Sequence, residues 1–342
     1  MKRYLARLVV AALCCGGCTP QPSTERIVGE TMGTTYDVTV TRSPDGIRRS
    51  DLESTIDAVL ADINRHLSTY DPSSDISRFN VNPSIDWIPV SRVLLDAVMQ
   101  SAQVSLATDG AFDITVGPIV KAWGFGPAAA DTADPPDAEQ IERLRLAAGQ
   151  DKLVARIDPP ALRKTVSALQ IDVDGIAPGI AVDRIAERFE ALGIRDYLVE
   201  LGGEVRARGL SPADRSWRVA VEAPAAGERR PFALLELDGF AVSTSGDYRD
   251  FRETAGRRVS HTIDPRTAAP VTHRLTSVTV VHASTAMADA FSTALMVLGP
   301  DEGLEAARRL RIAALFIERP PGEGAFIESQ TPEFASFRRP LP

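Results

Sequence analysis

The chain has 342 residues, of which 44% are hydrophobic and 25% charged, a balance that is typical of a folded globular protein and excludes a disordered or fibrous one. Its 46 acidic and 38 basic side chains give a net charge of −8, which argues against a general nucleic-acid binder because phosphate neutralisation needs a surplus of Lys and Arg. All three cysteines, Cys14, Cys15 and Cys18, lie near the N-terminus. This position excludes a disulfide scaffold, a cysteine-based zinc or iron–sulfur site and a thiol nucleophile from the rest of the chain.

The N-terminal segment has the pattern of a bacterial export signal. Basic residues precede an apolar stretch at 8–13 that is too short to span a bilayer as a helix. Two glycines stand directly before Cys18, as in a lipoprotein cleavage site, although Cys15 takes the place of the usual aliphatic residue. We predict a lipoprotein signal peptide at 1–17 and a lipidated Cys18 with a polar linker at 18–26. The expected location is the periplasmic side of the inner or outer membrane; the alternative is a cleaved signal without a lipid.

The remaining chain mixes helix and strand patterns. Apolar residues at helical spacing predict helices at 51–67, 91–107, 176–192 and 285–298, the last closed by Gly299 and Pro300. Apolar alternation or short apolar runs predict strands at 36–41, 197–201, 217–222, 232–237 and 276–281, and a surface loop is expected at 127–137. Because the order lacks a strict β-α rhythm, we predict an α+β fold and not a doubly wound sheet.

Two glycine- and aspartate-rich segments are candidates for ligand binding. In the first, 108–118, Asp113 follows Phe112, whose ring could pack against a ligand ring; a turn acid beside a core aromatic is the alternative. In the second, 171–183, glycines open a predicted helix. Such a helix start can admit and favour an anion such as a pyrophosphate, although an ordinary glycine-rich loop capping the helix would have the same composition.

Two further segments carry candidate catalytic groups. His261 stands among small polar residues before an Asp-Pro turn, whereas His273 and His282 lie at or within a predicted strand and are interpreted as structural. Asp289 and Thr293 are four residues apart on a predicted helix and therefore share one face. Their hard oxygen atoms suit Mg²⁺ rather than zinc; the alternative is an acid in a first helical turn and a threonine bonded to its own backbone.

In their order and spacing, these segments resemble the ApbE family of FAD:protein FMN transferases. The matching segments are 32–36, 67–71, 77–80, 110–113, 172–183, 245–249, 261–265 and 288–290. They place a catalytic domain of this family at 27–330, followed by a C-terminal tail at 331–342. The resemblance implies an ApbE-like fold of two mixed α/β lobes with the flavin site between them. It also implies Mg²⁺-dependent cleavage of FAD, attachment of the FMN moiety to a Thr or Ser hydroxyl of a target flavoprotein, and release of AMP.

The resemblance also implies the site residues. Flavin and adenine contacts would come from Met32, Tyr70, Ala111, Phe112, Asp113, Asp172 and Ile263. The metal site would use Asp289, Thr293 and the backbone carbonyl of Gly175. His261, near the reacting phosphate, and Asp289 would be the catalytic residues, with His261 acting as a base or only positioning groups. The partners would be FAD and an acceptor flavoprotein, such as a subunit of a membrane redox complex, with no nucleic acid and membrane contact through the lipid anchor alone.

Two positions depart from the family pattern. Pro178 stands where Lys or another polar residue is common, and Ala268 replaces the glycine of the usual turn after Asp264-Pro265. If that turn needs a positive φ, Ala268 would carry a strain of roughly 1–2 kcal/mol. Two other functions therefore stay open: an exported protein that binds FAD without transferring it, and a Mg²⁺-dependent pyrophosphatase that splits FAD into FMN and AMP with water.

Overall fold

The computed structural model describes residues 24–125, 135–225, 230–247, 251–254, 257–320 and 324–341. Its helices are α1 (Arg49–Leu67), α2 (Asp75–Val81), α3 (Arg92–Ala107), α4 (Gly117–Ala122), α5 (Ala138–Ala147), α6 (Ala177–Ala191), α7 (Thr285–Leu310) and α8 (Pro332–Ala335), with 3₁₀ turns at Ile114–Val116 and Gln150–Lys152. The signal peptide and Cys18 lie outside the described residues, as does most of the predicted 127–137 loop.

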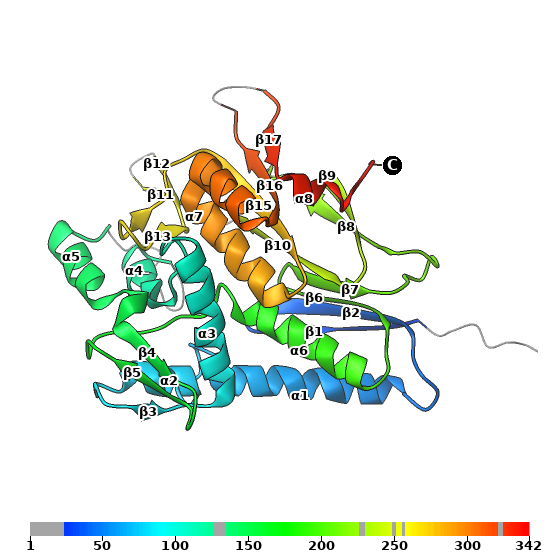
Figure 1. Ribbon diagram of the computed structural model, residues 1–342, viewed down its shortest axis with the longest axis horizontal. Helices are drawn as coiled ribbons and strands as arrows, with labels where there is room; N and C mark the ends of the chain where they lie inside the picture. The colour runs from blue at the N-terminus through cyan, green and yellow to red at the C-terminus, as the bar shows by residue number, and fades with distance from the viewer. Residues whose placement is uncertain are drawn as a thin grey trace, which may run out of the picture.

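An eight-stranded sheet organises the fold (Figure 1). Its spatial order is β1 (Glu25–Thr31), β2 (Thr34–Arg42), β6 (Asp196–Leu201), β7 (Glu204–Arg208), β10 (Phe240–Gly246), β15 (Leu275–His282), β16 (Ala313–Glu318) and β17 (Ile327–Gln330). Every neighbouring pair in this sheet is antiparallel. An antiparallel sheet with helices packed against it is an α+β arrangement, which confirms the predicted fold class.

Smaller sheets complete the structure. One joins β18 (Arg338–Arg339), β9 (Pro231–Leu237) and β8 (Trp217–Glu222), and another joins β3 (Ile88–Pro89), β5 (Ala161–Lys164) and β4 (Leu153–Arg156). Two-stranded pairs form between β11 (Phe251–Thr254) and β12 (Arg257–Ser260), and between β13 (Ile263–Asp264) and β14 (Ala269–Pro270). Within the described ranges, no helix is both long and apolar enough to cross a membrane.

The large sheet separates two hydrophobic cores because successive side chains of a strand point to opposite faces. Val280 and Phe316 belong to the core under the helices, whereas Val281 and Ile317, one residue further along each strand, pack toward β8 and β9. This double burial explains why β16 is an almost continuous apolar run, and why β15 is buried on both faces although it includes two threonines and a serine. Figure 1 shows α6 and α7 on one side of the sheet and β8 and β9 on the other.

Helical periodicity predicted α1, α3 and α6 to within a few residues. In α1 the buried positions are the ones that the apolar spacing marked, from Leu52 to Leu67. In α3 the side chain of Ser91 caps the helix by accepting a hydrogen bond from the Leu94 N–H group. The predicted strands at 217–222 and 232–237 correspond to β8 and β9.

One predicted boundary needs correction. The helix that begins at Thr285 does not close at Gly299 and Pro300 but resumes and continues to Leu310. Gly299 alone leaves the helical region, with φ 80° and ψ −172°. A proline without an N–H group fits the first turn of a restarted helix, so Gly299-Pro300 marks a break between two helical segments and not an end.

Candidate active site

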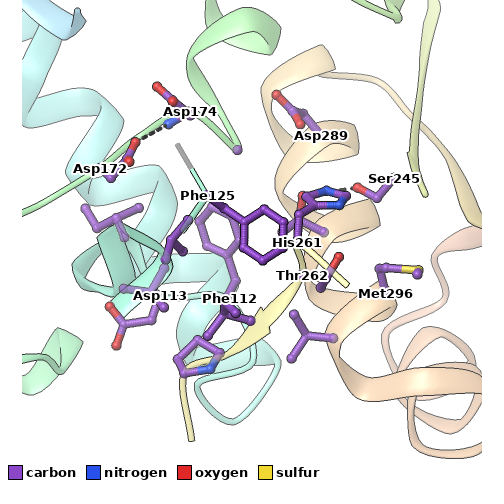
Figure 2. Close-up of a pocket in the computed structure, with 18 of the residues that line it drawn as sticks. Phe112, Asp113, Phe125, Asp172, Asp174, Ser245, His261, Thr262, Asp289 and Met296 are labelled. Carbon is purple, nitrogen blue, oxygen red and sulfur yellow. Dashed lines mark hydrogen bonds between the residues drawn. The ribbon is translucent and has the colours of Figure 1, made fainter. Parts of the chain in front are cut away.

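A cavity of about 860 Å³ opens beside α7 and brings distant segments together (Figure 2). Its walls come from the 111–125 loop, the 172–178 turn, the end of β10, residues 261–265 and the first half of α7. Most of the predicted site residues line it: Ala111, Phe112, Asp113, Asp172, Gly175, His261, Ile263, Asp289 and Thr293.

Two predicted flavin contacts are not among the residues lining this cavity. Met32 adopts a φ of 51° in the tight turn between β1 and β2 and packs half-buried against the main core. The side chain of Tyr70 is 67% exposed. The buried part of the Tyr70 side chain and the charges of Asp174 and Asp172, two acids of the cavity wall, raise the pKa of Tyr70.

The three predicted metal ligands lie together. Asp289 is only 5% exposed, and the hydrogen bond that it accepts from the Gly179 N–H group is long, at 3.4 Å. Burial raises the pKa of Asp289 well above its usual range, and the charge of Glu204 adds to the effect. A Cβ atom built on Gly175 would lie 3.6 Å from Thr293 Oγ1, so this threonine faces the Gly175 backbone.

A divalent cation fits this donor set. A buried carboxylate with one long hydrogen bond lacks compensation for its charge, and carboxylate, hydroxyl and carbonyl oxygens are the ligands that Mg²⁺ prefers. Within the described residues, no group of three or more His, Cys, Asp or Glu side chains could hold a metal ion. A cation at Asp289 would therefore complete its coordination with oxygens of a bound phosphate or water, as Mg²⁺ commonly does.

Two acids of the cavity wall were not among the predicted site residues. Burial raises the pKa of Glu204 to about 7, and burial together with the charge of Asp172 raises the pKa of Asp174 to about 7. Asp174 is part of the 171–183 segment, so its position was available from the motif. Glu204 follows Gly202 and Gly203, which turn between β6 and β7 with positive φ angles, and only that hairpin aims it at the cavity.

A hydroxyl group of β10 contacts the part of α7 that carries Thr293. Ser245 Oγ lies 3.1 Å from Thr293 Oγ1 and 2.8 Å from Ser292 Oγ. Figure 2 shows Ser245 directed toward α7 across the cavity from Asp172. In the 245–249 motif, Ser245 therefore orients the Thr293 hydroxyl. Residues 248 and 249 of the same motif lie outside the described residues.

The aromatic wall combines Phe112, Phe125 and His261. The rings of Phe125 and His261 stack edge to face, with centroids 6.3 Å apart and planes at 67° (Figure 2). Phe112 is buried, and one of its ring carbons would lie 3.3 Å from a Cβ built on Gly175. Glycine at position 175 therefore leaves the space that a ligand needs beside the ring.

Asp113 and Asp172 brace the cavity walls through hydrogen bonds. The Asp113 carboxylate accepts from the Thr115 N–H at 2.8 Å, from the Thr115 hydroxyl at 2.7 Å and from the Gln150 N–H at 2.9 Å. Burial nevertheless raises the pKa of Asp113. Asp172 Oδ1 accepts from the Asp174 N–H at 3.0 Å, which shapes the turn that leads to Gly175 (Figure 2). The Asp113 carboxylate thus holds its own loop while it lines the cavity.

The two departures from the family pattern have different structural outcomes. Pro178 occupies the first turn of α6, where its missing N–H group is harmless, and its ring lines the cavity. Ala268 adopts a φ of 56°, so the turn after Asp264 does need a left-handed residue. The same residue is buried, and its carbonyl accepts a hydrogen bond from Trp123 Nε1 at 2.9 Å.

Comparison with known proteins gives a consistent picture. The family described as the ApbE family matches residues 32–316. An FAD:protein FMN transferase of Escherichia coli K12 is 38% identical over 341 residues, covering 96% of each chain. A Vibrio cholerae protein of the same name is 36% identical over 337 residues, covering 98% of this chain and 99% of the relative.

Solved structures agree with this match. The apo form of the flavinyl transferase ApbE of Pseudomonas stutzeri superimposes with a TM-score of 0.85 at 42% identity, covering 93% of this chain and 97% of that one. The flavin transferase ApbE of Vibrio cholerae gives a TM-score of 0.84 at 35% identity, covering 92% and 99%. The mixed arrangement of helices and antiparallel strands is therefore shared with flavin transferases.

Proposed function

Because this chain belongs to the ApbE family, we propose that it cleaves FAD with the help of Mg²⁺ and attaches the FMN moiety to a Thr or Ser hydroxyl of a target flavoprotein. The chain is a transferase of flavin, as its relatives are. One observation supports the metal part of the proposal: the nearly buried Asp289 carboxylate lines the same cavity as Thr293 and Gly175, and Thr293 Oγ1 faces the Gly175 backbone.

The transfer exchanges the phosphoanhydride bond of FAD for a phosphate ester bond to the acceptor. The acceptor hydroxyl oxygen bonds to the phosphorus of the FMN half, the bond from that phosphorus to the bridging oxygen breaks, and AMP leaves with the bridging oxygen. A bound Mg²⁺ would neutralise charge on the pyrophosphate, which is where phosphoryl transfer gains most. Asp289, Thr293 and the Gly175 carbonyl would hold it, while the Phe112 side of the cavity receives the flavin.

The proton of the acceptor hydroxyl needs a group to receive it. His261 lines the cavity and is held by the ring of Phe125, which makes it the candidate. Whether His261 acts as a base or positions the reactants is decided by the pH–rate profile of His261→Asn. Loss of a limb of the profile indicates a base, whereas a uniformly lower rate with an unchanged profile indicates positioning.

The transferase test uses the purified protein, FAD, Mg²⁺ and an acceptor flavoprotein domain. Mass spectrometry should find covalent FMN on the acceptor, and AMP should appear in equal amount. Free FMN with no adduct would show that water is the acceptor and that the chain is a pyrophosphatase. Stably bound, uncleaved FAD without any response to Mg²⁺ would show that it only binds flavin.

The metal ligands have a matched test of their own. Asp289→Ala should abolish Mg²⁺-dependent turnover, since it removes the carboxylate from the proposed site. Thr293→Ser keeps the ligating oxygen and should stay active, whereas Thr293→Val keeps the shape and removes the oxygen. Equal activity of the Ser and Val variants would exclude Thr293 as a ligand.

We also propose that the protein works on the periplasmic side, anchored through a lipid on Cys18. The basic and apolar segments before Cys18 support this location. The acceptor would then be a flavoprotein exposed in the same compartment, such as a subunit of a membrane redox complex. Cys18→Ser should move the protein from the membrane fraction to the soluble fraction, and an unchanged distribution would exclude the anchor.

A further inference from the structure

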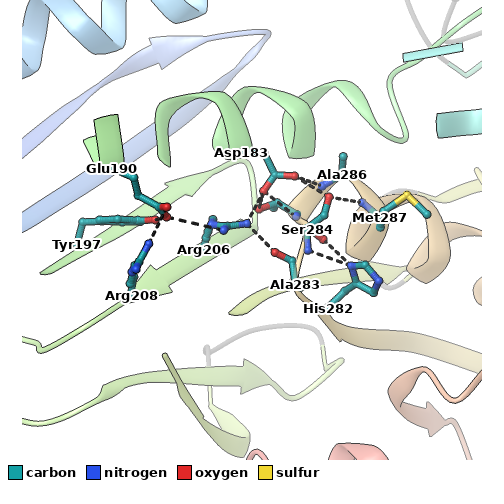
Figure 3. A network of polar contacts seen from close by, with 11 residues as sticks. Asp183, Glu190, Tyr197, Arg206, Arg208, His282, Ala283, Ser284, Ala286 and Met287 are labelled. Atoms are coloured by element: carbon teal, nitrogen blue, oxygen red, sulfur yellow. Dashed lines mark hydrogen bonds and ion pairs between the residues drawn. The ribbon is translucent and has the colours of Figure 1, made fainter. Parts of the chain in front are cut away.

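Asp183 lies in the middle of α6, yet its carboxylate contacts the start of another helix, α7 (Figure 3). Oδ1 accepts hydrogen bonds from the Thr285 N–H at 2.9 Å and the Thr285 hydroxyl at 2.7 Å. Oδ2 accepts from the Ala286 N–H at 3.1 Å and the Ser284 hydroxyl at 2.7 Å. The first N–H groups of a helix have no partner within it, so Asp183 caps α7 from outside.

A half-buried arginine holds this carboxylate in place. Arg206, on β7, donates from Nη1 to Asp183 Oδ1 at 2.9 Å and to the Ala283 carbonyl at 2.6 Å. The side chains of Arg206 and Asp183 are only 20% and 16% exposed. Beyond Arg206 the network continues to Glu190, which accepts from the Tyr197 hydroxyl at 2.7 Å and pairs with Arg208 at 2.6 Å (Figure 3). The cap is therefore anchored to the sheet as well as to α6.

The two helices touch through their backbones at Gly179. A Cβ atom at this position would lie 2.7 Å from Ala286 Cα and 2.7 Å from the Thr285 carbonyl oxygen. Asp183 stands four residues after Gly179, which is about one helical turn. Gly179 and Asp183 both contact the first turn of α7 at Thr285 and Ala286, and Asp289 stands four residues after Thr285, about one turn further along α7 at the cavity.

From these contacts we infer that Asp183 is a positioning residue for the cation site. Gly179 and Asp183 stand one turn apart on α6 and both contact the first turn of α7, so the cap adds hydrogen bonds, oriented by Arg206, to the close backbone contact at Gly179. With both contacts in place, Asp289 and Thr293 on α7 keep their spacing from the Gly175 carbonyl before α6. Asp183 does not line the cavity and would act without touching FAD. The inference rests on the metal site proposed above.

A purely structural cap makes a different prediction. If Asp183 only stabilised the fold, its loss would lower the melting temperature and leave the Mg²⁺ response of the folded protein unchanged. If it positions the ligands, its loss should raise the Mg²⁺ concentration needed for half-saturation by about 10-fold or more, as disturbed outer contacts of metal ligands commonly do. Saturating Mg²⁺ should then restore much of the activity, and the FAD affinity measured without metal should stay unchanged.

Four variants of the full chain separate the two roles. Asp183→Asn keeps the shape and removes one acceptor oxygen, and Thr285→Ala removes a single hydrogen bond to Asp183 while sparing the fold. Thr285→Ser restores the hydroxyl. Glu190→Gln is the matched control, because it weakens the same buried network at its far end without touching α7.

The binding readout is independent of turnover. Mg²⁺ is titrated into FAD-loaded protein without an acceptor, and the midpoint of its stabilising effect is followed by thermal unfolding. Hydrogen exchange of the amides at 285–289 reports directly on the start of α7. The Mg²⁺ concentration at the midpoint of the titration should be lowest for the wild type and Thr285→Ser, higher for Thr285→Ala and highest for Asp183→Asn. Glu190→Gln should have the wild-type value.

Wild-type midpoints in both Asp183→Asn and Thr285→Ala would overturn the inference, as would an equal rise in Glu190→Gln. If Asp183→Asn fails to fold, the pair Thr285→Ala and Thr285→Ser decides alone. Asp289→Ala, run alongside, tests the premise separately: a retained Mg²⁺ response in that variant would overturn the metal site itself and not only the role of Asp183.

Discussion

The contact at Gly179 allows one substitution to test how the helix crossing controls the site. Gly179→Ala adds a Cβ atom that would stand 2.7 Å from Ala286 Cα and 2.8 Å from Ala286 N. Carbon atoms pack favourably at about 3.5–4.0 Å, so α7 would have to move away from α6 by roughly 1 Å. The colliding atoms are backbone, and no rotamer change can relieve the contact.

Two opposing effects set the expected loss of stability. Overpacking of this kind costs about 1–3 kcal/mol. Alanine in a helix recovers up to about 1 kcal/mol relative to glycine. The net expectation is a destabilisation of about 1–2 kcal/mol. Because the move separates Asp289 from Gly175, the Mg²⁺ half-saturation should also rise about 10-fold.

The assay combines thermal unfolding with Mg²⁺ titration of FMN transfer. Gly303→Ala is the matched control: it adds a Cβ 2.8 Å from the Leu295 carbonyl oxygen, in the part of α7 after the Gly299 break. Gly303→Ala should lower the free energy of unfolding by about as much as Gly179→Ala does, and it should leave the Mg²⁺ half-saturation unchanged. A Gly179→Ala protein with wild-type stability and Mg²⁺ response would refute the reasoning, as would an equal shift in Gly303→Ala.

Three further predictions concern stability. Burial lowers the pKa of Lys164 from about 10.5 to about 8. The free energy of unfolding of the wild type, relative to that of Lys164→Met, should therefore increase by up to about 3 kcal/mol as the pH rises from 8 to 10.5. A flat difference in pH-dependent unfolding would contradict this shift. Ala268→Gly should change the free energy of unfolding by less than about 1 kcal/mol. Relief of the left-handed strain is offset by the loss of a buried methyl group and by a more flexible unfolded chain. A gain above about 2 kcal/mol in calorimetry would contradict this prediction. Ser74→Ala should cost about 1–2 kcal/mol, since Ser74 Oγ accepts from the Ser77 N–H and donates to the Ser68 carbonyl, and an unchanged melting temperature would argue against that cap.

Local features of the sequence were sufficient for much of the fold. Apolar spacing marked α1, α3 and α6, because a helix that covers a core must repeat its apolar face every three to four residues. The break at Gly299-Pro300 was also visible, but not its meaning: the same two residues can end a helix or interrupt one. Only the packing of 301–310 against the core decides between them.

The candidate site was predicted in part, for a similar reason. Helical spacing selected Asp289 and Thr293, the family resemblance added Gly175, and in the structure all three line one cavity. It does not put Met32 or Tyr70 among the residues lining the cavity. Two acids of the cavity wall were not predicted. Asp174 lies within the 171–183 segment but has no distinctive pattern of its own, and Glu204 reaches the cavity through the hairpin turn between β6 and β7.

The sequence by itself determined which residue types are available for chemistry: no cysteine after Cys18, hard oxygen donors on one helix face, and one histidine set among small polar residues. Tertiary structure alone decided how they work together. Asp183 reads in sequence as an ordinary helical acid, yet it caps a helix that begins 102 residues later. This contact forms because α6 and α7 cross closely at Gly179, which has no side chain, and because the half-buried Arg206 orients the Asp183 carboxylate. Neither residue belongs to a periodic sequence pattern from which the contact could be predicted.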